Sequence, residues 1–287
     1  MKQTIAIDAM GGDHAPHEVV AGAVLVAQRH ADLHIKLVGQ RAKIEPYLPS
    51  PLPNNISMVN ATDVIEMSEP PVPAVRSKPD SSINVGLQLV RQGEAGAFVS
   101  AGNTGAAMAA ALFILGRIEG VDRPAIMGVL PSRSGHLVVL DMGANVDCKP
   151  RHLVQFAQMG MMFSKCILQI PKPRVALLNI GEEPEKGNEL TVSAHQLLVK
   201  QNDVNFIGNI EGTLLYSGVA DVVVCDGFNG NIVLKLSEGV VEIILNFMRS
   251  EIEASVLAKI GAVLLRPVFK KLKKKIDYDE FGGALLL

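Results

Sequence analysis

One short segment, residues 100–106, combines residue types that suit the binding of an anion. It reads Ser100-Ala101-Gly102-Asn103-Thr104-Gly105-Ala106, between an apolar run at 95–99 and an Ala-rich run at 106–115. The first run predicts a buried strand, and the second, which is apolar on every side, predicts a helix enclosed by protein. Glycines let backbone N–H groups approach a ligand, and a helix N-terminus offers unpaired donors at the positive end of its dipole. The candidate phosphate or oxyanion ligands here are Gly102, Asn103, Thr104 and Gly105.

The same layout recurs four more times, where glycine, asparagine and aspartate follow an apolar run. These loops are 10–16, 141–147, 181–187 and 226–231. If the preceding strands are parallel, their loops gather at one edge of the sheet, where ligands bind. We therefore expect the loops to form one cleft. Their candidate substrate or phosphate ligands are Gly11, Gly12, Asp13, Asn145, Asp147, Gly181, Glu182, Asn229 and Asn231.

Three cations, Lys186, Arg76 and Lys78, are expected nearest to this cleft and could neutralise a bound phosphate. Three aspartates, Asp8, Asp141 and Asp226, stand at the ends of predicted strands, where an aspartate either caps the next helix or binds a metal. Any one of these polar residues, taken singly, is as well explained as a turn, cap or surface residue. The candidate catalytic residues are Asn103, Lys186 and Asp226.

Several function classes are excluded by what the sequence lacks. It has no GxGxxG after the first strand, no Walker A motif and no GxSxG, so a dinucleotide, a nucleoside triphosphate and a nucleophilic serine are not indicated. Asp13, His14 and His17 have poor spacing for a metal, and we expect neither metal nor cofactor. Aromatic residues make up 4% of the chain, with no Trp, which argues against nucleic acid. Three scattered cysteines and the absence of a signal peptide favour a reducing cytoplasm.

Strand-like and helix-like segments alternate along all 287 residues. This predicts an α/β fold, a mostly parallel sheet flanked by helices in three layers, as one domain over 1–287. The three prolines within 67–73 predict irregular structure there. A strand over 204–207 is expected to end in a loop at Gly208.

The segment from about 250 to 276 has a different character. Apolar residues recur there every four positions, with lysines and one arginine in between, and Pro267 is expected to break the helix. This basic amphipathic element is either a core or oligomer helix with a solvated face, or a surface for an anionic membrane or an acidic protein.

These motifs together resemble the PlsX family, the phosphate acyltransferases of bacterial phospholipid synthesis. The resemblance rests on residues 8–13, 100–106, 141–147, 178–187 and 226–231, in order along the chain. It implies that acyl-[acyl-carrier-protein] and inorganic phosphate give acyl phosphate and free carrier protein. The acyl phosphate then serves a downstream glycerol-3-phosphate acyltransferase. The resemblance also implies a fold similar to phosphotransacetylase and isocitrate dehydrogenase, a homodimer, no cofactor, and a cytoplasmic enzyme loosely attached to the inner face of the membrane.

In this reaction, glycine-loop N–H groups with Lys186 or with Arg76 and Lys78 would hold phosphate, and Asn103 or a nearby backbone N–H would stabilise the oxyanion. The resemblance also implies that members of the family continue beyond the position of residue 287, so we expect this C-terminus to be truncated. The alternatives are a phosphotransacetylase that uses acyl-CoA, a non-catalytic scaffold that recruits lipid enzymes to the membrane, and, more weakly, a metal-dependent dehydrogenase.

Overall fold

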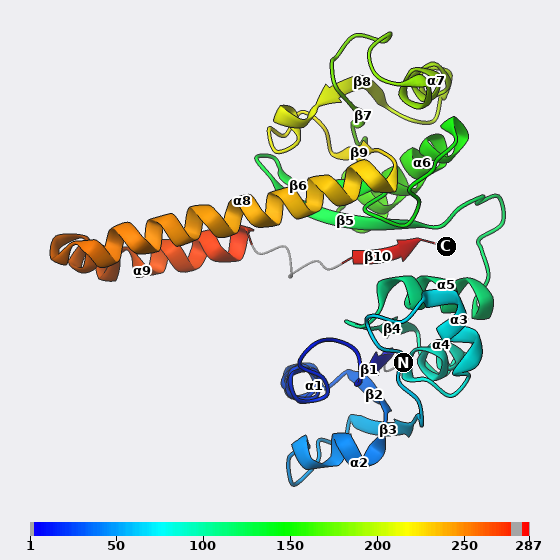
Figure 1. The fold of residues 1–287 in the computed structure, drawn as a ribbon, viewed down its shortest axis with the longest axis vertical. Helices are drawn as coiled ribbons and strands as arrows, with labels where there is room; N and C mark the ends of the chain where they lie inside the picture. Colours follow the sequence, from blue (N-terminus) through cyan, green and yellow to red (C-terminus); the bar gives the residue numbers. More distant parts are fainter. Residues whose placement is uncertain (1–2, 277–282, 287) are drawn as a thin grey trace. The chain divides into compact units, whose positions relative to one another are not determined.

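The computed structural model of the protein describes residues 3–276 and 283–286, with side chains except those of 273–276 (Figure 1). It consists of two compact units, Met1–Glu119 and Gly120–Leu286, each with its own sheet. From the sequence we expected one domain around one sheet. The α/β class with parallel strands is confirmed in both units.

The first unit has a four-stranded, wholly parallel sheet in the order β3-β2-β1-β4. Its strands are β1 (Gln3–Asp8), β2 (Leu33–Gly39), β3 (Ile56–Asn60) and β4 (Ala97–Val99). Its helices are α1 (His17–Arg29), α2 (Arg41–Ile44), the 3-10 turn η1 (Glu45–Tyr47), α3 (Pro71–Ser77), α4 (Ser82–Arg91) and α5 (Thr104–Ile114). Alternate residues of β2 are buried on opposite faces, Ile35 and Leu37 under α1 and Val38 towards α4, which gives three layers.

The second unit has a six-stranded sheet in the order β10-β5-β6-β9-β7-β8. Its strands are β5 (Ala125–Ser132), β6 (Gly135–Leu140), β7 (Val175–Asn179), β8 (Phe206–Glu211), β9 (Val222–Val224) and β10 (Gly283–Leu286). The four strands from β6 to β8 are parallel, whereas β5 pairs antiparallel with both β6 and β10. Helices α6 (Pro150–Cys166) and α7 (Glu189–Leu198) cover one face, while the 3-10 turn η2 (Gly212–Leu214) and the start of α8 (Gly227–Ala254) cover the other.

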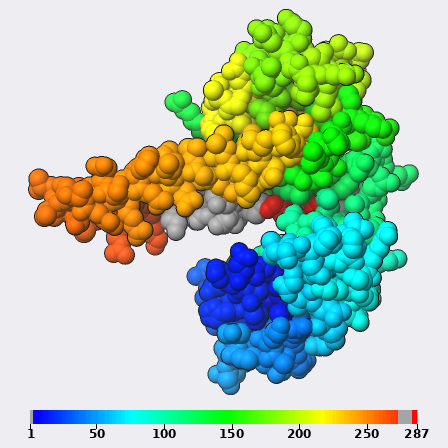
Figure 2. Space-filling view, in the orientation of Figure 1, coloured from blue at the N-terminus to red at the C-terminus, as the bar shows by residue number. Residues whose placement is uncertain are grey.

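Two helices, α8 and α9 (Val256–Ile276), form an arm that projects from the sheet of the second unit, with α9 returning along α8 (Figures 1 and 2). Many large apolar side chains of this helical arm are exposed, among them Leu236, Phe247, Leu257 and Leu264. A core role for the 250–276 segment is therefore wrong within this chain. Within residues 3–276 and 283–286, no helix combines the length and the apolar character needed to cross a membrane.

Three local predictions were wrong. Helix α3 begins at Pro71, inside the segment expected to be irregular. Proline is tolerated there because the N–H groups of the first helical turn have no partner within the helix, so the missing N–H costs nothing. Pro267 lies inside α9, and the interruption falls at Ser255 instead. Strand β8 continues through Gly208, whose φ of +104° is accommodated by an irregular register between β7 and β8.

Candidate functional site

In the first unit, the loops that follow β1 and β4 contact each other. The Ser100 hydroxyl donates to Asp8 Oδ2 at 2.7 Å and accepts from the Gly102 N–H at 3.0 Å. A Cβ added to Gly11 would lie 2.6 Å from Asp8 Oδ2 and 2.7 Å from the Gly102 nitrogen. Only glycine fits at Gly11, because the two backbones touch there. The structure thus brings Gly11 and Gly102 together, with Gly12 against Ala101, in one glycine-lined patch next to the segment that enters α5.

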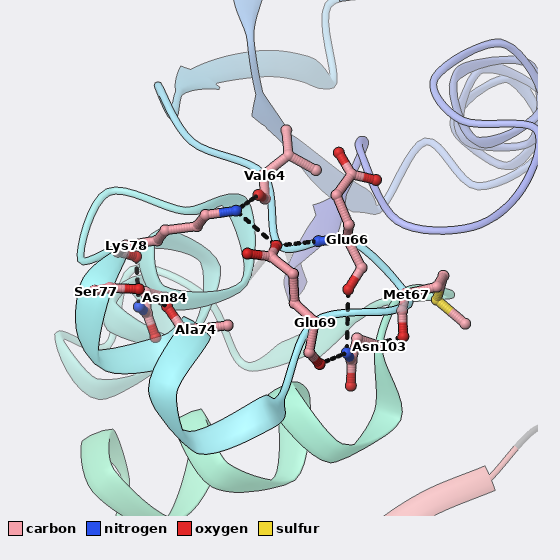
Figure 3. Close-up of polar contacts among 9 residues, drawn as sticks. All are labelled: Val64, Glu66, Met67, Glu69, Ala74, Ser77, Lys78, Asn84 and Asn103. Atoms are coloured by element: carbon pink, nitrogen blue, oxygen red, sulfur yellow. Dashed lines mark hydrogen bonds and ion pairs between the residues drawn. The ribbon is translucent and has the colours of Figure 1, made fainter.

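Asn103 does not present its amide to a ligand (Figure 3). Its Oδ1 accepts from the Ala106 N–H at 3.0 Å and so caps α5, while its Nδ2 faces three backbone carbonyls at 3.0–3.3 Å. An amide nitrogen has two hydrogens, and both are directed at these carbonyls. The hypothesis that Asn103 donates to the oxyanion therefore does not fit this geometry, and the N–H groups of Thr104 and Gly105 are the better donors.

Lys78 is also occupied by the protein. Its Nζ donates to Glu69 Oε2 at 2.6 Å and to the Val64 carbonyl at 2.7 Å (Figure 3). The hydrogen bond from Lys78 lowers the pKa of Glu69 below its ordinary value, so the Glu69 carboxylate is ionised at neutral pH. Arg76 lies on the exposed side of α3 with its guanidinium 5.2 Å from the centre of the Phe113 ring. Of Lys78 and Arg76, Arg76 is the better candidate for binding an anion.

In the second unit, the buried carboxylate of Asp141 organises the loop after β6. Asp141 is fully buried, and its oxygens accept five hydrogen bonds, from Ile126 N, Gly143 N, Ala144 N, Asn145 N and Asn145 Nδ2. Asn145 also donates to the Pro124 carbonyl at 2.7 Å. The side chains of Asp141 and Asn145 therefore shape the loop, and the direct phosphate contact predicted for the Asn145 amide does not fit.

Asp226 caps the neighbouring helix, α8. Its carboxylate accepts from the Asn229 N–H at 2.8 Å and from Asn229 Nδ2 at 2.9 Å. The Gly227 N–H donates to the Asn145 carbonyl at 2.8 Å, which joins the start of α8 to the loop after β6. Strands β6 and β9 are neighbours, so their loops meet, as expected for parallel strands. Asn229 and Asn231 are exposed there, and Asn231 faces Gly143.

The loop 181–187 follows β7 and presents Lys186. Asn179 Nδ2 donates to the Lys186 carbonyl at 2.8 Å, and Asn209 Nδ2 donates to the Glu183 carbonyl at 2.9 Å. The stem of Lys186 passes over Gly181, where an added Cβ would lie 3.0 Å from Lys186 Cγ. The Lys186 side chain is exposed on a loop whose backbone is tied at two points, which suits a cation that must meet a substrate.

The predicted site residues thus fall into two groups, one in each unit. Five of them are exposed: Asp13, Arg76, Thr104, Asp147 and Glu182. That all the loops line one cleft stays a prediction, because the groups belong to different units. Among the described residues, no three His, Cys, Asp or Glu side chains are grouped so as to hold a metal ion.

The cysteine thiols nearest to these loops are poor nucleophiles. Burial raises the pKa of the Cys148 thiol to about 12, and the carboxylates of Asp141 and Asp226 add to this. Burial also raises the pKa of Cys225, which lies next to the Asp141 carbonyl. Because the thiolate is the reactive form, neither thiol is poised to form a covalent acyl-enzyme.

Sequence reasoning missed the residues that hold the loops in place. Ser100, Glu69, Asn179 and Asn209 were not among the candidate ligands, yet each fixes a glycine-bearing or strand-end loop. The only signal for Ser100 was its position directly after the apolar run of β4. For Glu69 there was none, because its partner lies nine residues away across a helix that was not expected.

The chain resembles known proteins along its whole length. Residues 3–287 match the family described as "Fatty acid synthesis protein". A phosphate acyltransferase of Synechococcus sp. is 52% identical over 99% of this chain and 78% of its own length, and one of Pelotomaculum thermopropionicum is 55% identical over 99% and 82%.

Solved structures agree in fold. A phosphotransacetylase from Streptococcus pyogenes has a TM-score of 0.62 at 18% identity, covering 83% of this chain and 82% of its own. The EutD phosphotransacetylase from Staphylococcus aureus has a TM-score of 0.58 at 18% identity, covering 83% and 82%. The family match and the two phosphate acyltransferase relatives, together with the motifs at the strand ends, show that the chain belongs to the PlsX family of phosphate acyltransferases, transferases of fatty acid and phospholipid synthesis.

Proposed function

We propose that the chain transfers an acyl group from acyl-[acyl-carrier-protein] to inorganic phosphate. The observation that carries the proposal is the glycine-lined patch of Gly11 and Gly102, beside the α5 N-terminus, in a chain whose relatives are named phosphate acyltransferases. A phosphate oxygen forms a bond to the thioester carbonyl carbon and the carbon–sulfur bond breaks. The proton of hydrogen phosphate ends on the thiolate of the carrier protein, so atoms and charges balance.

Backbone N–H groups and side chains have different roles in this proposed reaction. The N–H groups of Thr104 and Gly105 stabilise the oxyanion, since the first turn of a helix leaves its donors unpaired. Two cations are candidates for neutralising phosphate: Lys186, exposed on its tied loop in the second unit, and Arg76, exposed on α3 in the first unit. Asp226 and Asn229 fix the start of α8. Hydrogen phosphate is itself a competent nucleophile near neutral pH, so holding the two reactants in line is the main requirement, and no cofactor is needed.

Lys186→Ala should lower kcat/KM for phosphate by about 10- to 100-fold, because a charge that contacts the reacting anion is lost. The measurement is acyl phosphate formation from long-chain acyl-carrier-protein at varied phosphate concentration. Lys200→Ala removes the same charge from an exposed position after α7 and should leave the rate unchanged. Equal or faster turnover of acyl-CoA would favour a phosphotransacetylase instead. Product formation in neither case would leave the scaffold as the better description.

We further propose that the chain is a homodimer that uses the helical arm, and that it works at the inner face of the cell membrane, where a glycerol-3-phosphate acyltransferase takes its product. Exposed Leu236, Val240, Ile243 and Phe247 recur at three- and four-residue spacing, so they share one face of α8. Such an apolar stripe marks an interaction surface. Its spacing is that of a seam between helices, which a second copy of the same arm can complete.

Leu236→Glu combined with Ile243→Glu should convert a dimer into a monomer, because two charges would be buried in the seam. Sedimentation velocity gives the oligomeric state, and Glu242→Gln on the same helix is the matched control. A wild-type chain that sediments as a monomer but binds anionic vesicles would overturn the dimer and assign the arm to lipid.

A further inference from the structure

A second feature of the first unit lies outside the ligands just assigned: residues 64–70, here called the strap, are tied to the protein at both ends. Lys78 holds both ends, because its Nζ donates to the Val64 carbonyl at 2.7 Å and to Glu69 Oε2 at 2.6 Å. The same Glu69 oxygen accepts from the Glu66 N–H at 2.7 Å. Figure 3 shows the bonds from Lys78 and from the Glu66 N–H meeting at the Glu69 carboxylate. The ion pair therefore closes the strap on itself, and each end depends on Lys78.

Between these ends, Asn103 joins the backbone of the strap to α5. Its Nδ2 donates towards the carbonyls of Glu66, Met67 and Glu69, while its Oδ1 caps the helix. Pro71, directly after the strap, lies against the first turn of α5, where a Cβ added to Gly105 would be 2.6 Å from Pro71 Cγ. The strap thus lies beside the donors of Thr104 and Gly105.

We propose that Asn103, Glu69 and Lys78 are positioning residues that hold the strap beside the α5 N-terminus, next to the glycine-lined patch assigned to phosphate, an inference that rests on the proposed function. Lys78 acts through Glu69 and is not a ligand of phosphate. The Lys78 ammonium group also neutralises the carboxylate of Glu69, and the backbone carbonyl of Glu69 lies 3.0 Å from Asn103 Nδ2. Without Lys78, that carboxylate would be left as an unpaired negative charge close to a site for an anion.

This arrangement predicts a rescue that a direct ligand would not show. Lys78→Ala should raise KM for phosphate about tenfold, with a smaller change in kcat at saturating phosphate, because loosened positioning and the unpaired Glu69 both weaken anion binding. Adding Glu69→Gln to Lys78→Ala should recover part of that loss, since the uncompensated charge is removed. If Lys78 were itself a ligand, Glu69→Gln alone would lower KM by releasing the lysine, and the double variant would show no recovery.

Asn103→Ser separates the two roles of Asn103. Serine caps a helix about as well as asparagine, but its side chain is too short to reach the strap carbonyls. We expect KM for phosphate to rise about tenfold, and the combination with Lys78→Ala to be less than multiplicative because both changes act through the strap. Lys43→Ala, which removes an exposed charge from α2, is the control and should leave both constants unchanged.

Hydrogen exchange gives a readout that does not depend on turnover. The Glu66 amide should exchange faster in Lys78→Ala, Glu69→Gln and Asn103→Ser than in the wild type or Lys43→Ala. Unchanged exchange in these variants, or a fully multiplicative effect of the paired changes on KM, would overturn the proposal. A wild type that makes no acyl phosphate would instead overturn the proposed function, and the two failures are thereby distinguished.

Discussion

Asp141→Asn should lower the free energy of unfolding of the second unit by about 3–5 kcal/mol, the range for breaking a buried charged network. The carboxylate is fully buried and accepts five N–H groups. Asparagine replaces one acceptor oxygen by an NH₂ group, which would face donors in place of an acceptor. At least two buried N–H groups would then be left without a partner.

Asp147→Asn is the matched control for this prediction. It removes the same charge from the same loop, but at an exposed position, and should change the free energy of unfolding by less than about 0.5 kcal/mol. Urea unfolding followed by circular dichroism gives both values, and hydrogen exchange of β5 and of residues 143–146 shows whether the loss is local. An Asp141→Asn variant as stable as Asp147→Asn would mean that the loop after β6 is organised by other contacts.

Local patterns in the sequence predicted the elements well. The strand expected from the apolar run at 95–99 is present as β4 (Ala97–Val99), and the helix expected from the Ala-rich run at 106–115 is present as α5 (Thr104–Ile114). Each is marked by its own apolar run, with glycine and asparagine in between. Asp8, Asp141 and Asp226 do stand where strands end. What a short window of residues encodes could be predicted.

Long-range pairing could not be predicted in the same way. Asn103 faces carbonyls that lie 34 to 37 residues earlier, and no local pattern indicates which carbonyls those are. The alternation of strands and helices is the same whether the strands join one sheet or two, so the division at 119/120 is invisible in it. The contacts that Lys78 and Asn145 make with the protein were missed for a related reason: a polar residue near a predicted loop can bind the protein itself as well as a ligand.

Gly230→Ala should be the most damaging small substitution in α8. Alanine in place of glycine ordinarily stabilises a helix interior by about 1 kcal/mol. At Gly230, however, an added Cβ would lie 1.9 Å from the Asp141 carbonyl oxygen and 3.1 Å from Cys225 Sγ. The overlap is with backbone, which cannot rotate away, so α8 must shift. We expect the second unit to lose about 3 kcal/mol of stability, at the upper end for an overpacked site.

Gly239→Ala tests the same substitution in the same helix without the overlap. Gly239 is exposed and an added Cβ there meets no atom within 4 Å, so this variant should gain up to about 1 kcal/mol. Urea unfolding of the two variants should therefore give changes of opposite sign. Equal changes would mean that the start of α8 is not packed against Asp141. Because the shift of α8 in Gly230→Ala also moves Asp226 and Asn229, its turnover should fall while that of Gly239→Ala is retained, which links the packing of one glycine to the chemistry at the strand ends.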